Sequence, residues 1–90
     1  MARVDFDTYV PVSLAFPPVD IADDLFAKGL ESSTGGENGA ELIDAHKWFN
    51  LAALKGNEDA LRYRQEISEE LSQNEIAIAQ KAARKWLQTH

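Results

Sequence analysis

Two groups of acidic side chains have the residue types that acid–base catalysis or cation binding would require. They are the adjacent pair Asp23 and Asp24, and the set Glu66, Glu69 and Glu70. Neighbouring residues on a helix point about 100° apart, so the aspartates would diverge and instead complement the positive N-terminus of an expected helix. The glutamates have the spacing of a solvated helix face. The sequence therefore predicts no catalytic residues and a protein that is not an enzyme.

Histidine and cysteine, the other common residues of catalytic and metal sites, are scarce. The chain has no cysteine and two histidines, His46 and His90. Two histidines without thiolates cannot complete a structural zinc site, so we expect neither a metal nor a cofactor. His46 is next to Lys47 and has no acidic residue four positions later that could orient its ring. We therefore expect His46 to be a surface histidine.

The charge of the chain disfavours two classes of partner. Its 90 residues carry a formal net charge of −6, and its pI is near 4.7. Such a chain repels the phosphates of nucleic acids and of anionic lipids, whose protein partners present basic patches. No apolar run reaches the length of a transmembrane helix, and prolines interrupt the apolar residues near the N-terminus. We expect a cytoplasmic domain, although a mature periplasmic or secreted protein would have the same composition.

Helices must position these side chains. Sequence signals for helix starts and ends delimit them after residue 19. The expected helices span about 20–32, 38–55, 58–71 and 72–88. The signals are the N-caps Asp20, Asn38 and Asn57, the capping box Ser72-x-x-Glu75, and Gly56 as a left-handed helix end. Lys81, Arg84 and Lys85 suit the C-terminal half of the last helix. The pattern predicts an all-α fold.

A stripe of small and aromatic residues in the second expected helix returns in the fourth. The segment 45–49, Ala-His-Lys-Trp-Phe, reappears as Ala-Arg-Lys-Trp-Leu at 83–87, a displacement of 38 residues that also relates Ala22 to Ala60. This period suits repeats built from pairs of helices. Small side chains let helix backbones approach while large rings fill the groove between them. We therefore expect core packing, rather than ligand binding, for the rings of Trp48, Phe49, Tyr63 and Trp86.

The same stripe has a fixed pattern, Ala-x-x-Trp-aromatic-x-x-Ala-Ala-x-x-Gly, formed by Ala45, Trp48, Phe49, Ala52, Ala53 and Gly56. This pattern resembles the second helix of the Sel-one-like repeats, which are relatives of the tetratricopeptide repeats. The first-helix pattern of that family is matched more loosely, by Ala22, Phe26, Ala27 and Leu30. The following unit keeps Ala60 but has Arg64 and Gln65 where the family has Leu-Gly, so it resembles a degenerate capping unit.

The resemblance covers roughly residues 20–88 and implies two antiparallel helical hairpins that form a fragment of an α-solenoid. One full repeat would span about 20–57 and a degenerate capping repeat about 58–88, within a repeat domain at 20–90. Such repeats bind proteins or peptides and scaffold complexes without catalysis. By alignment with tetratricopeptide units, the groove would be lined by Ile21, Asp24, Lys28, Glu31, Ser32, Asp59, Arg62, Glu66, Glu69 and Glu70. Because this set is mainly acidic, a basic or mixed-charge peptide is the expected ligand.

Residues 1–19 form a separate N-terminal arm, in which apolar residues alternate with polar ones at the period of a strand. Three outcomes remain open: a disordered tail, an extended arm packed on its own helices, or an arm donated to another chain. The last would make a homodimer. An alternative function is therefore structural self-association, through this arm or through Leu51 and Leu54, which lie outside the repeated stripe.

Overall fold

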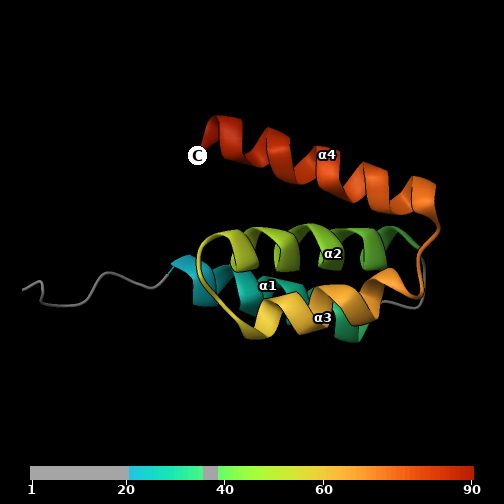
Figure 1. Cartoon of the computed structure of the whole chain (residues 1–90), viewed down its shortest axis with the longest axis horizontal. Coiled ribbons are helices and arrows are strands. Elements are labelled where there is room, and N and C mark those ends of the chain that lie inside the picture. Colours follow the sequence, from blue (N-terminus) through green and yellow to red (C-terminus); the bar gives the residue numbers. More distant parts are fainter. Residues whose placement is uncertain (1–20, 36–38) are drawn as a thin grey trace, which may run out of the picture.

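The computed structural model describes residues 21–35 and 39–90, which form helices joined by turns (Figure 1). The helices are α1 (Ile21–Gly35), α2 (Gly39–Leu54), α3 (Asp59–Ser68) and α4 (Gln73–Thr89). The described residues contain no strand, so the prediction of an all-α fold is confirmed for them. The expected caps Asp20 and Asn38 and the N-terminal arm at 1–19 lie outside the described residues.

The central element of the fold is α2, because each of the other helices packs against it. In Figure 1, α1 and α3 lie on one side of α2, and α4 lies alone on the other. Phe49 and Ala52 of the predicted stripe are fully buried, and so is Leu51. The prediction that Leu51 could mediate self-association is therefore wrong. A helix covered on both sides buries more than one stripe, whereas Leu54 at its end remains 62% exposed.

Three aromatic rings from three helices form the part of the core between α1, α2 and α3. The ring of Phe49 lies 5.6 Å from that of Phe26 and 5.4 Å from that of Tyr63, and Phe26 and Tyr63 meet edge to face at 5.1 Å. Gly29 of α1 makes room for this cluster, since a Cβ atom added there would lie 2.5 Å from Phe49 Cδ1. The sequence predicted core packing for Phe49 and Tyr63, but it gave no reason to single out Gly29.

The turn from α2 to α3 follows the predicted signals. Gly56 has a φ of +111°, its N–H donates to the carbonyl of Ala53 at 3.1 Å, and the N–H of Asn57 donates to the carbonyl of Ala52 at 2.9 Å. These two bonds form a Schellman ending, which places a glycine at this position. Asn57 Oδ1 then accepts the N–H of Ala60 at 3.0 Å, so Asn57 caps α3 as expected.

The predicted capping box of α4 is present. Ser72 Oγ accepts the N–H of Glu75 at 3.1 Å, and Glu75 Oε1 accepts the N–H of Ser72 at 2.8 Å. The predicted end of α1 at Ser32 is wrong, because α1 continues to Gly35. Ser33 Oγ donates to the carbonyl of Leu30 at 2.9 Å. This hydroxyl is satisfied within the helix, so it does not force the helix to end.

Candidate functional site

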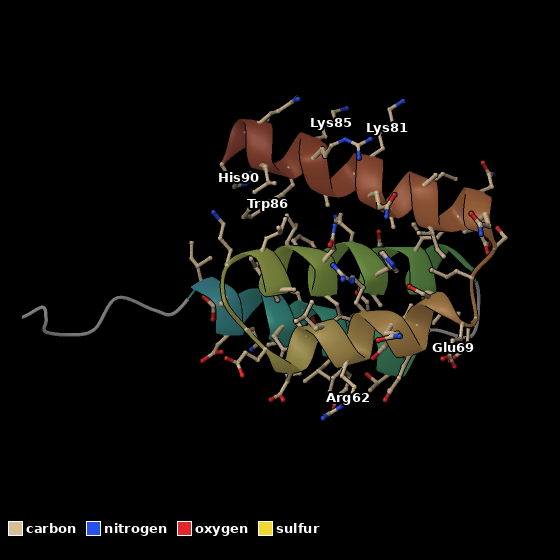
Figure 2. The ribbon with its side chains drawn as sticks, in the orientation of Figure 1. Arg62, Glu69, Lys81, Lys85, Trp86 and His90 are labelled. Carbon is tan, nitrogen blue, oxygen red and sulfur yellow. The ribbon has the colours of Figure 1, made fainter. Side chains whose placement is uncertain are left out.

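The residues predicted to line a groove lie on α1, on α3 and in the turn after α3. Nine of these candidates are exposed, and together we call them the acidic surface: Ile21, Asp24, Lys28, Glu31, Asp59, Arg62, Glu66, Glu69 and Glu70. Ser32, the remaining candidate, is half-buried. Figure 2 shows Arg62 and Glu69 pointing away from α2. The exposure follows from the packing of α1 and α3, whose apolar sides face α2 and leave these positions in solvent.

The acidic surface carries six carboxylates and two cations. Both cations lie near aromatic rings: Lys28 Nζ is 5.4 Å from the centroid of the Trp48 ring, and Arg62 Cζ is 5.3 Å from that of Tyr63. Cation–π contacts of this kind stabilise a charge without neutralising a carboxylate. The surface therefore keeps a net negative charge that can attract a basic ligand.

His46 is the clearest departure from the sequence-based expectation, because it is buried, with 2% of its surface exposed. Its Nε2 lies 3.0 Å from Ser68 Oγ, and Ser68 Oγ donates its proton to the carbonyl of Arg64 at 2.8 Å. Since that hydroxyl proton is already used, Nε2 must be the donor to Ser68. Nδ1 is then an unprotonated, buried atom, and it has no hydrogen-bond partner among the described residues. The prediction of a surface histidine is wrong.

His46 belongs to a polar seam between α2 and α3, which we define as His46, Asn50, Arg64 and Ser68. Arg64 Nη1 donates to Asn50 Oδ1 at 2.7 Å. Burial, and then the positive charge of Arg64, lower the pKa of His46 below its ordinary value of 6.5. Each helix contributes two polar residues four positions apart, so they stack along the line of contact. The spacing of four residues within each pair can be read from the sequence. Its meaning becomes clear only once α2 and α3 are known to pack together.

The polar seam is not arranged as a nucleophile with its base. Activation of a serine requires a histidine nitrogen that accepts the hydroxyl proton. Here the proton of Ser68 is directed to a helix carbonyl, and His46 donates to the hydroxyl oxygen instead. The seam therefore joins two helices and fixes their register.

The two tryptophans are half-buried and lie where α2 and α4 meet. Their rings are 6.3 Å apart and edge to face, and Lys47 Nζ lies 3.9 Å from the centroid of Trp48. The ring of His90 stacks on Trp86 at 4.2 Å, and Figure 2 shows Trp86 pointing from α4 toward α2. Both tryptophans pack against the buried core, as the sequence predicted.

Within the described ranges, no group of three His, Cys, Asp or Glu side chains could hold a metal ion. In the same part of the chain, no helix is long and apolar enough to cross a membrane. No family model matches this chain, and comparison with curated proteins and with solved structures also finds no match.

Proposed function

We propose that this chain is a non-enzymatic protein-interaction module that binds a basic or mixed-charge peptide or protein on the acidic surface. One observation carries the proposal: α1 and α3 each divide into a side that packs on α2 and a side that is charged and exposed. Leu25 and Ile67 are buried on the first side, at 3% and 8% exposure. The second side carries the six carboxylates. A surface held by a packed core can present charges to a partner at little ordering cost.

We further propose that α1 and α2 form an antiparallel hairpin of the Sel-one-like type, followed by α3 and α4 as a second, degenerate unit whose helices pack on α2 rather than on each other. The burial of Phe49 and Ala52 and the left-handed Gly56 agree with the roles of these residues in the repeat pattern. The packing of α3 and α4 on α2 agrees with contact between neighbouring units of a helical repeat. Because α3 and α4 lie on opposite sides of α2, they depart from the closed hairpin of a full repeat, and together they would act as the degenerate capping unit.

The affinity of such a site would be modest. Each exposed ion pair contributes about 0.2–1 kcal/mol, so several carboxylates would have to act together. Ile21, which is 52% exposed beside Asp24, would add an apolar contact. A ligand with basic side chains around an apolar residue fits this combination best.

Charge reversal on the acidic surface tests the proposal. A short Lys/Arg peptide containing one leucine should bind the wild-type protein, and binding should weaken as salt rises. Glu66→Lys should weaken binding, because Glu66 is exposed on α3. The matched control is Asp44→Lys, which makes the same change of charge at an exposed position of α2. Equal loss in both variants, or loss in neither, would show that the acidic surface is not the binding site.

A second candidate function, structural self-association, is favoured by Leu54, which is 62% exposed at the end of α2. Sedimentation at two protein concentrations separates the two functions, since only self-association makes the mass depend on concentration. A Leu54→Lys variant should then remain monomeric. A constant monomer mass would leave the peptide-binding module as the better proposal.

A further inference from the structure

The outer face of α4 carries a basic strip, which we define as Lys81, Arg84, Lys85 and Gln88. These residues line one shallow hollow on the surface. Their spacing places them on the same side of the helix, opposite Ala79 and Ala83, which are buried against the core. Figure 2 shows Lys81 and Lys85 pointing away from the other helices. The strip is a positive region on a chain whose formal net charge is −6.

Interactions among residues 21–35 and 39–90 do not account for the three cations of the strip. The three cations lie in the C-terminal half of α4, but none of them is in its last turn, which contains no basic residue. A helix terminus affects charges only within about one turn. Among the described residues the three cations form no ion pair. The acidic residue in the first turn of α4, Glu75, is used in the capping box.

We propose that the basic strip is a second interaction surface, which binds an acidic peptide segment of a partner protein. Lysine and arginine side chains without internal partners attract carboxylates, and Gln88 can donate to a carboxylate or to a peptide carbonyl. Two apolar residues of α4 remain exposed beside the strip, Ile78 at 48% and Leu87 at 38%. The best ligand is therefore an acidic segment that also carries an apolar side chain. This inference does not depend on the acidic surface of α1 and α3.

Other polyanions and a second copy of the chain fit the strip less well. A nucleic acid would meet three cations on a molecule that is otherwise acidic, and such a chain repels an extended row of phosphates. A second copy would meet the strip with its acidic surface, but the two chains, each with a net charge of −6, would repel one another outside that contact. A short acidic segment touches only the strip, so it avoids most of this repulsion.

Binding of two matched peptides to the full chain tests this inference. The probe is a short peptide of Asp and Glu around one leucine, and its control replaces the acids by Asn and Gln. The acidic peptide should bind, with an affinity that falls as salt rises, and the amide peptide should not. Lys81→Glu with Lys85→Glu should weaken binding about tenfold. Lys55→Glu, at an exposed position outside α4, changes the net charge as much as Lys85→Glu alone and should have a smaller effect than that variant.

Three results would overturn the inference. Binding of neither peptide would make the strip an ordinary solvated surface. Equal weakening by Lys85→Glu and Lys55→Glu would show that the effect comes from net charge alone. The mass of the wild-type protein could also rise with protein concentration. If Lys81→Glu with Lys85→Glu abolished that rise, the ligand of the strip would be a second copy of the chain. Circular dichroism of each variant, matching the wild-type spectrum, would show that lost binding does not come from lost folding.

Discussion

Replacement of Gly29 by alanine should destabilise the domain, although alanine favours helix more than glycine does. In an exposed helix this change would gain about 1 kcal/mol. At Gly29, however, the added Cβ would lie 2.5 Å from two carbons of the Phe49 ring, and Phe49 is fully buried. Inserting an atom into a well-packed core costs roughly 1–3 kcal/mol, and a ring held between Phe26 and Tyr63 has little room to move. If the added atom costs about 3 kcal/mol and the gain in helix propensity returns about 1 kcal/mol, the net loss of stability is about 2 kcal/mol.

Thermal unfolding followed by circular dichroism measures this loss. For a domain of this size, 2 kcal/mol corresponds to a decrease in Tm of about 8–16 °C. Ala27→Gly, at an exposed position of the same helix, measures the effect of an alanine–glycine exchange on helix propensity without a steric clash. In a Phe49→Leu background the contact is removed, so Gly29→Ala should no longer destabilise the domain. A Gly29→Ala variant that melts above the wild type would refute the close packing of α1 on α2.

Two further predictions concern His46 and the N-terminal arm. Because burial lowers the pKa of His46 in the folded state, the unfolded state takes up the proton first, so stability should fall as the pH drops below 6.5. His46→Gln should flatten this dependence in melts measured across pH, whereas His90→Gln should preserve it. Deletion of residues 1–16 should lower the Tm if the arm covers exposed apolar side chains such as Leu61, which is 50% exposed. Unchanged Tm and mass after the deletion would instead indicate a tail that does not contribute to the fold.

The helix ends that the sequence predicted correctly depend on chemistry within a few residues. Gly56 and Asn57 define the turn between α2 and α3 through their own backbone and side-chain bonds. Ser72 and Glu75 form a capping box from positions three apart. Such contacts need no knowledge of the rest of the molecule, so sequence reasoning could find them.

The burial of His46 and Leu51 could not be predicted in the same way. Both lie outside the stripe on α2, and each is buried only because other helices pack on further sides of α2. The partners of the polar seam, Arg64 and Ser68, come from α3, and the seam exists only once α2 and α3 meet. For the candidate site, helix periodicity indicated which glutamates face solvent. It could not show that the three cations of the basic strip on α4 have no ion-pair partner in the described part of the chain.

The central position of α2 also bears on how the domain loses structure. Because α1, α3 and α4 each pack chiefly on α2, opening α2 would release all of them, whereas α4 could detach while the other three stay together. Its contact consists of the small residues Ala79 and Ala83 with the half-buried Ile76 and Trp86, whereas α1 and α3 also share the ring contact of Phe26 with Tyr63. Amide hydrogen exchange should therefore be slowest in α2 and faster in α4, so that α4 behaves as a separate unit of local unfolding. The basic strip would then lie on the least protected helix, where a bound peptide would have the largest effect on exchange.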